Sequence, residues 1–324
     1  MAPDSPDWRE SPVRGRLYSL GVTDDRGNYG FRSESVEDPQ ELRKIADFRR
    51  RIRQIPLLLE SWQKLSDSER LADSQLALDD EFTAWRHLSS GVNYSLNFAS
   101  DNLRMLHQIH REDAADPLPF VASYPLARSA LEAGALAHWV LAPDDPRERV
   151  ARHLRNAARE LFEETSLRNY AFELADEAPD LIGISRSKLS EQRRQLTAWR
   201  KKHSGQIAEC ASRIGITSPV GGRRVGFADI VGDATEAAGL ARWHGVLVWM
   251  QISGLTHPSL MRAVSTLAMT EERDNSDGTV NVLMTSTTDT VSSAVIAAVI
   301  QFRQALTVLR TRKQTSGDRA DYRR

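Results

Sequence analysis

Apolar residues recur at spacings of three and four along most of the chain, which is the period of an amphipathic helix. In the stretch PQELRKIADFRRRIRQIPLLLESWQKL, the period is carried by Leu42, Ile45, Phe48 and Ile52. Pro56 interrupts the stretch, and because proline lacks an N–H donor, we expect it to kink or divide the helix. The pattern therefore predicts a mainly α-helical chain.

The same period predicts further helices, whose ends are marked by proline, glycine and other turn residues. Pro143 stops one helix, and Asp145 followed by Pro146 is typical of the N-cap and first position of the next. The later helices are expected at residues 79–110, 117–142, 146–178, 187–214, 228–238, 240–257 and 290–312. The last of these is apolar nearly all round, so we predict that it is the central core element.

Two regions break the helical period. Within 262–287, two runs rich in Val, Thr and Met flank the turn sequence DNSDG, which predicts a small β-hairpin. Residues 1–38 are polar, with one further candidate hairpin at DDRGN, and are expected to form a flexible N-terminal arm. The charged tail 313–324 is expected to be disordered. The predicted fold is a single helical domain over 39–312, a bundle of seven or eight helices with the hairpin.

Composition restricts the partners and the location of the protein. The 43 basic and 44 acidic residues nearly cancel, so no overall field attracts nucleic acid, and DNA is not expected as a partner. No apolar signal segment opens the chain, and the longest apolar run, Val291–Phe302, is shorter than the roughly 20 residues of a membrane span. The single cysteine, Cys210, excludes a disulfide framework. We therefore expect a cytoplasmic protein that does not enter a membrane.

The sequence lacks the motifs of several common enzyme classes. The glycines of PVGGRRVG are followed neither by Gly-Lys-Ser/Thr nor by a GxGxxG pattern, so a nucleotide site is not expected there. There is no HExxH motif and no pair of ExxH motifs. His107 and His110 have a spacing that two metal ligands can share, but without a carboxylate motif we predict two surface histidines. Neither a cofactor nor a metal is expected.

An Arg and a His on one helix with four to six residues between them are typical of HEPN-type RNases. Arg104 with His110 and Arg147 with His153 have this spacing. In a chain with this much arginine, chance alone accounts for two such pairs. RNA cleavage in a defence or toxin role therefore remains an alternative function.

A row of arginines follows the helix predicted at 146–178. Arg149, Arg152, Arg155 and Arg159 recur every three or four residues, and glutamates follow closely. This pattern favours a solvated, salt-bridged face with an i,i+4 pair from Arg159 to Glu163. The other interpretation is a phosphate or RNA groove in which Arg149 and Arg152 bind the ligand.

Two polar pairs interrupt apolar helix faces and form the candidate site. Arg128 and Glu132 lie one turn apart on one helix, and Ser253 and His257 lie one turn apart at the end of another. Because an isolated buried charge costs on the order of several kcal/mol, we expect the pairs to meet, with His257 donating to Glu132. The stripe around Arg128 contains two candidate ligand contacts, Tyr124 and Trp139, together with Leu131 and Ala135.

The same segments carry a resemblance to other proteins. YPLARSALEAGALAHWVLAPDDPRERVARHL, RRVGFADIV and ISGLTHPSL resemble a group of uncharacterised bacterial proteins, many of them actinobacterial. In that group an R-x-x-x-E helix, an Arg-rich helix after a Pro/Asp turn and an S-x-x-x-H-P/G helix end recur. The resemblance covers roughly residues 123–260. It implies a shared fold and the importance of these positions, and it implies no activity.

Two classes of function remain open. The first is a binding or scaffold protein, in which the polar residues fix helix pairing and an apolar helix face makes a homodimer. The second is a pocket for a small molecule or RNA, or an enzyme in which His257 is the general base, Glu132 orients it and Arg128 holds an anion. Ser253 is a weaker candidate nucleophile, because it lies beside the histidine on one helix instead of on a strained elbow. We favour the first class.

Overall fold

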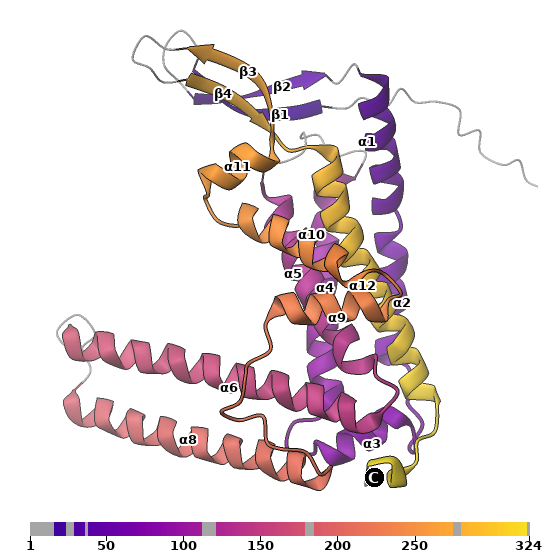
Figure 1. Cartoon of the computed structure of the whole chain (residues 1–324), viewed down its shortest axis with the longest axis vertical. Helices are drawn as coiled ribbons and strands as arrows, with labels where there is room; N and C mark the ends of the chain where they lie inside the picture. The colour runs from indigo at the N-terminus through magenta and orange to yellow at the C-terminus, as the bar shows by residue number, and fades with distance from the viewer. Residues whose placement is uncertain are drawn as a thin grey trace, which may run out of the picture.

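The structure is a computed structural model that describes residues 16–23, 29–35, 38–111, 121–178, 185–274 and 280–322. It is mainly helical, as the hydrophobic period predicts, and a four-stranded antiparallel sheet lies at one end of the helices (Figure 1). The first six helices are α1 Pro39–Ile52, α2 Ile55–Asp67, α3 Gln75–Phe82, α4 Leu88–His110, α5 Ser123–Leu141 and α6 Pro146–Glu177. The later ones are α8 Arg186–Arg213, α9 Phe227–Ala237, α10 Arg242–Leu255, α11 Leu260–Thr266, α12 Thr288–Gln314 and the 3₁₀ helix η1 Arg319–Tyr322.

Local sequence signals explain several helix ends. Pro56 lies in the first turn of α2, so the expected division of the first helix is confirmed. Asp145 caps α6 by accepting a hydrogen bond from the backbone N–H of Arg147 at 2.9 Å, as its place before Pro146 predicts.

The continuous helix expected over 79–110 is wrong, because the chain breaks between α3 and α4. Thr83 Oγ1 accepts the backbone N–H of Leu88 at 3.0 Å. Asp80 Oδ1 accepts that of Ser89 at 2.9 Å. These side chains satisfy the free N–H groups of the first turn of α4, and so they stabilise a second helix start where the apolar period runs on.

The helices α5 and α12 form the centre of the larger hydrophobic core, with α4 on the other side of α5 (Figure 1). Gly134 allows α5 to approach α12 closely, since a Cβ at this position would lie 3.1 Å from the backbone nitrogen of Phe302. The prediction that the last helix is a core element is confirmed by its buried residues, which include Val291, Val295, Phe302 and Leu306. In the described part of the chain, α12 is also the one helix that is long and apolar enough to cross a membrane, a criterion that a buried core helix meets equally.

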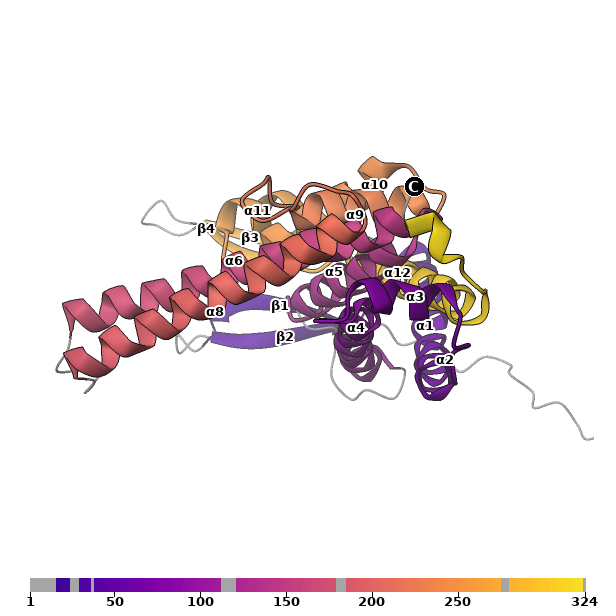
Figure 2. The same ribbon diagram turned by 90° about the horizontal axis from the view of Figure 1, so that it is seen from below.

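The helices α6 and α8 run side by side and project from the bundle as a long arm (Figures 1 and 2). A second, smaller hydrophobic cluster fills the base of this arm. Val150 and Leu154 of α6 meet Ile207 and Ala211 of α8 there. The outer part of the arm carries exposed apolar side chains, among them Leu167 and Tyr170.

The sheet has the strand order β2-β1-β4-β3, with β1 Arg16–Thr23, β2 Tyr29–Ser35, β3 Ala268–Asp274 and β4 Val280–Thr285. The strands β3 and β4 pair antiparallel within the range where a hairpin is expected, although the first part of that range is the helix α11. The strands β1 and β2 lie within residues 1–38, which are expected from the sequence to form a flexible arm. That prediction is wrong for these two segments, because they pair with each other as antiparallel strands. The connections 24–28 and 275–279 lie outside the described residues.

The tail expected to be disordered over 313–324 packs against the domain along its described part. Tyr322 is 1 % exposed, and its ring stacks on Phe82 with centroids 4.4 Å apart. Arg319 pairs with Glu81 at 2.8 Å. The prediction is therefore wrong for these residues, because a single buried aromatic can anchor a segment that has no apolar period.

Candidate functional site

The predicted pair Arg128 and Glu132 forms on α5. Arg128 Nε donates to Glu132 Oε1 at 2.8 Å, and the two side chains are 27 % and 18 % exposed. A second donor, Arg128 Nη1, reaches Thr256 Oγ1 just after α10 at 2.9 Å. The pair therefore joins α5 to the end of α10 while it keeps contact with solvent.

Trp249 takes the position that the sequence analysis assigns to His257. Its Nε1 donates to Glu132 Oε1 at 2.7 Å, and the Arg128 guanidinium lies over its ring at 5.7 Å from the centroid. Trp249, Ser253 and Thr256 follow one another at helical spacing, so the face that meets α5 is shifted from the one predicted. A half-buried indole needs a partner for its N–H, and that requirement is the sequence signal that could have pointed to Trp249.

His257 does not join the site. The helix α10 ends at Leu255, so His257 lies beyond the helix cap and is exposed, whereas the prediction extended the helix to residue 257. Within the described residues, its side chain makes no hydrogen bond to Glu132. Ser253 Oγ is buried and has no hydrogen-bond partner there. The expected network of Arg128, Glu132, Ser253 and His257 is therefore corrected to one of Arg128, Glu132, Trp249 and Thr256, and the structure gives His257 no geometry as a general base.

The two candidate ligand contacts of the α5 stripe are core residues. Tyr124 is fully buried and donates to Ser286 Oγ at 3.1 Å, and burial raises the pKa of its hydroxyl. Trp139 is 2 % exposed and donates to Asp233 Oδ2 at 3.1 Å. Both polar groups are occupied by protein partners, so neither side chain is available to a ligand.

Most of the arginine row on α6 forms the salt-bridged face that the sequence favours. Arg152 Nε and Arg155 Nη1 both donate to Glu148 Oε1 at 2.9 Å. Arg152 also lies over the Trp139 ring at 5.1 Å and donates to the Trp139 carbonyl at 2.8 Å. Arg159 approaches Glu163 at 3.6 Å, which is the predicted i,i+4 pair. Two of the three guanidinium nitrogens of Arg152 are therefore bonded within the protein, and Glu148 balances its charge.

Arg149 differs from the rest of the row, because it is 1 % exposed and faces inward. Its Nε and Nη2 donate to the two carboxylate oxygens of fully buried Asp79 at 2.8 and 3.0 Å. Its Nη1 donates to the carbonyls of Pro143 and Asp144 at 3.1 and 2.9 Å. Positions three apart on a helix differ by about 60° around the axis, which is enough to turn one arginine of the row into the core. The predicted role of Arg149 on a solvated or ligand-binding face is wrong.

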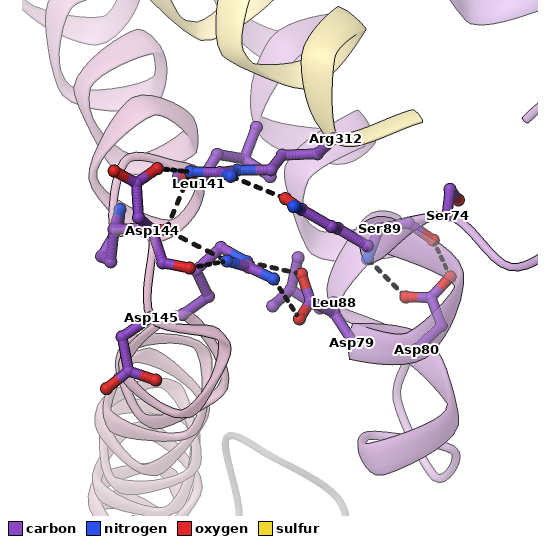
Figure 3. Close-up of polar contacts among 12 residues, drawn as sticks. Ser74, Asp79, Asp80, Leu88, Ser89, Leu141, Asp144, Asp145 and Arg312 are labelled. Atoms are coloured by element: carbon purple, nitrogen blue, oxygen red, sulfur yellow. Dashed lines mark hydrogen bonds and ion pairs between the residues drawn. The ribbon is translucent and has the colours of Figure 1, made fainter. Parts of the chain in front are cut away.

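Arg312 of α12 completes this buried cluster (Figure 3). It donates to the carbonyl of Pro143 at 2.9 Å, to Asp144 Oδ1 at 2.8 Å and to Gln75 Oε1 at 2.6 Å. Arg312 Nε also donates to the carbonyl of Leu141, the last residue of α5, at 3.3 Å. Both arginines bind carbonyls of the short segment between α5 and α6, where backbone acceptors have no helical partner. Together with the hydrogen bond from Tyr322 to Asp79 at 2.6 Å, the cluster ties α3, α5, α6, α12 and η1 together.

The histidines of the Arg–His pairs are inside the protein. His110 Nε2 is hydrogen-bonded to Ser123 Oγ at 2.9 Å, and His153 Nε2 donates to the carbonyl of Arg86 at 3.0 Å. Burial lowers the pKa of each to about 4. The expectation that His110 is a surface histidine is wrong, and the Arg–His pairs give the RNase alternative no support. The described residues contain no group of three His, Cys, Asp or Glu placed to hold a metal ion.

A cavity of about 510 Å³ lies away from the predicted site, at the base of the arm. It is an open cavity lined by α6, α8 and the segment before α4, with Trp85, Trp199 and His203 among its walls. Its volume is in the range of small-molecule sites. Nothing in the sequence pattern signals it, because its walls come from three separate segments.

No protein-family model, no curated protein and no solved structure matches the chain. Function is therefore inferred from the side chains of this chain alone.

Proposed function

We propose that this protein is a helical binding protein that associates with a second copy of itself through the outer face of α10 and α11. The observation that carries the proposal is an uncharged, apolar surface. Between Arg242 and Arg262 the sequence has no Asp, Glu, Lys or Arg, although 27 % of the chain is charged. The large side chains left exposed on this face are Leu240, Trp243, Leu247, Met250, Leu260, Met261 and Val264.

Packing on the opposite side fixes the orientation of this face. Ile252 and Leu255 of α10 are buried, and α9 approaches α10 so closely that a Cβ at Gly245 would overlap Thr235. The helix cannot rotate its outer residues inward without losing this contact. Trp243, Leu247 and Met250 are more than half exposed and stay on the surface. Contiguous apolar surface of this kind is rare on monomers and marks association sites.

A second copy is the occupant that fits the surface best. The spacing of Leu240, Trp243, Leu247 and Met250 is three, four and three, the spacing of the seam between two packed helices. A two-fold contact places the same patch on both sides and needs no opposite charge on the partner. The neutral surface meets this condition, whereas it offers no charge by which RNA would be selected.

The test is the molar mass in solution, measured by light scattering during gel filtration. The wild type is expected at twice 36.3 kDa, and Leu247→Glu is expected at 36.3 kDa with an unchanged melting curve. Two carboxylates brought together across a two-fold axis should weaken association by about 100-fold or more. Leu167 on the arm is at least as exposed as Leu247, so Leu167→Glu is the matched control and should remain a dimer. A monomeric wild type, or equal effects of the two substitutions, would overturn the proposal. Binding of the outer face of α10 and α11 to lipid vesicles in place of dimerisation would also overturn it.

A further inference from the structure

The cavity at the base of the arm has aromatic walls. Trp199 and His203 lie one turn apart on α8 and meet edge to face, with ring centroids 4.7 Å apart. Trp85, from the segment between α3 and α4, lies 5.7 Å from His203. Three rings from two separate segments therefore border one space of about 510 Å³. The faces of such rings carry partial negative charge and attract cations.

The charged residues that line the cavity itself are mainly acidic. Glu160, Glu163 and Glu164 of α6 line it, against one arginine, Arg86. Burial, together with the positive charges of Lys202 and Arg86, lowers the pKa of His203, so its ring is neutral at pH 7. The lining therefore has an excess of negative charge.

Two of the three carboxylates keep capacity for a ligand. Glu160 is held by Arg86 and by the amide of Asn156 at 2.7 Å. Glu163 lies 3.6 Å from Arg159, which is too far for a hydrogen bond, and Glu164 accepts from Arg168 through Oε1. A carboxylate has about four lone-pair positions, so Glu163 and Glu164 can face a second cation.

A cation of the protein already uses one of these rings. The guanidinium of Arg168 lies over the Trp199 ring, 5.0 Å from its centroid. Arg168 and Trp199 both border a neighbouring cavity, and Trp199 is the wall that the two cavities share. Leu161, Leu167 and Ile207 complete the walls of the first cavity with apolar surface. Apolar walls disfavour a strongly hydrated ammonium group and favour one whose charge is covered by methyl groups.

We propose that this cavity binds a hydrophobic organic cation of the quaternary ammonium class. The aromatic faces and apolar walls contact the alkyl groups, and Glu163 and Glu164 balance the charge. None of the residues that line the cavity belongs to α10 or α11, so the proposed site does not depend on self-association.

A pair of isosteric probes separates charge from shape. Choline and 3,3-dimethyl-1-butanol have the same branched head, and only choline is charged. Titration calorimetry on the full chain is expected to show saturable binding of choline and at least about tenfold weaker binding of the neutral alcohol, a difference of about 1.4 kcal/mol. Equal affinity for the two probes would show an apolar cavity with no preference for charge. Absence of saturation by choline would also overturn the proposal.

Substitutions locate the binding. Glu163→Gln with Glu164→Gln keeps the shape of both side chains and removes their charge, so choline affinity should fall about tenfold while the affinity of the alcohol stays level. The matched control is Glu191→Gln with Glu209→Gln, two exposed glutamates of α8 that do not line the cavity. Trp199→Leu removes the shared ring and should reduce choline binding at least as much. Equal losses in the control pair would mean that choline responds to overall charge, and the site would be refuted.

Discussion

Two arginine–carboxylate pairs in this protein have the same chemistry and opposite surroundings. The side chains of Arg149 and Asp79 are 1 % and 0 % exposed, and the two residues lie 70 positions apart in the sequence. Arg128 and Glu132 are 27 % and 18 % exposed and lie one turn apart on a single helix. The first pair connects distant parts of the chain. The second pair lies on the surface of α5, where α5 contacts α10.

The difference shows which charges can change partners. In the buried cluster, every guanidinium nitrogen of Arg149 donates to Asp79 or to the carbonyls of Pro143 and Asp144, so any rearrangement leaves a buried group unsatisfied. At Glu132 water can replace a lost partner, because the site is partly open. A ligand or a second protein can therefore replace a partner of the open pair with little loss of stability. The buried pair instead holds the helices in place.

The largest effect is expected from Asp79→Ala. The substitution leaves the Arg149 guanidinium buried without its counter-ion and removes the acceptor of the Tyr322 hydroxyl. Breaking a buried pair in this way costs about 3–5 kcal/mol. Urea unfolding followed by circular dichroism measures the loss in the free energy of unfolding.

Two variants calibrate this result. Asp47→Ala breaks an exposed pair with Arg50 on α1 and should change stability by less than about 1 kcal/mol. Tyr322→Phe removes only the hydroxyl that donates to Asp79 and should cost about 1–2 kcal/mol. If Asp79→Ala is no more costly than Asp47→Ala, the two environments do not differ and the comparison fails.

An intermediate effect is expected from acid, through His153 near the buried cluster. Burial lowers its pKa to about 4 from an ordinary value of 6.5. Because the unfolded chain binds the proton more tightly, His153 contributes stability above pH 6.5 that is lost as the pH falls toward 4. Between pH 7.5 and pH 5 this loss is about 2 kcal/mol.

The variant His153→Gln isolates this contribution, since the amide can still donate to the carbonyl of Arg86 and does not titrate. Urea melts at the two pH values should show a loss about 2 kcal/mol smaller in the variant than in the wild type. The same acid sensitivity in both proteins would place the titrating group elsewhere.

Local sequence patterns predicted most of the helices, because periodicity and caps act within a few turns. The Asp145–Pro146 start of α6, the division at Pro56 and the buried α12 are all local or nearly local features. The break between α3 and α4 was missed, since Asp80 and Thr83 cap a helix that the apolar period alone continues. The hydrophobic period predicts that a segment is helical. It does not predict where side chains such as Asp80 and Thr83 bind backbone N–H groups and start a new helix.

Contacts between distant segments were not predictable in the same way. The helical period groups Arg149 with the solvated arginine row although it faces the core, and it does not name Asp79 as the partner 70 residues earlier. At the open pair the sequence named Arg128 and Glu132 correctly and the third member wrongly. The cause was the end of α10, because a helix two residues shorter than predicted removes His257 and leaves Trp249 as the donor.

The smallest effect is expected at the open pair, from Glu132→Gln. The amide oxygen can still accept the Trp249 N–H, and only the ion pair with Arg128 is lost. Since Arg128 also donates to Thr256 and reaches solvent, we expect a loss of no more than about 1 kcal/mol in the free energy of unfolding.

A double-mutant cycle of Glu132→Gln and Trp249→Phe should be non-additive by about 0.5 kcal/mol or more, because both changes act on one carboxylate. His257→Ala is the matched control and should add independently to Glu132→Gln. Coupling of His257 to Glu132, or a loss at Glu132 as large as that of Asp79→Ala, would mean that the open pair is closed in solution and that the contrast between the two pairs does not hold.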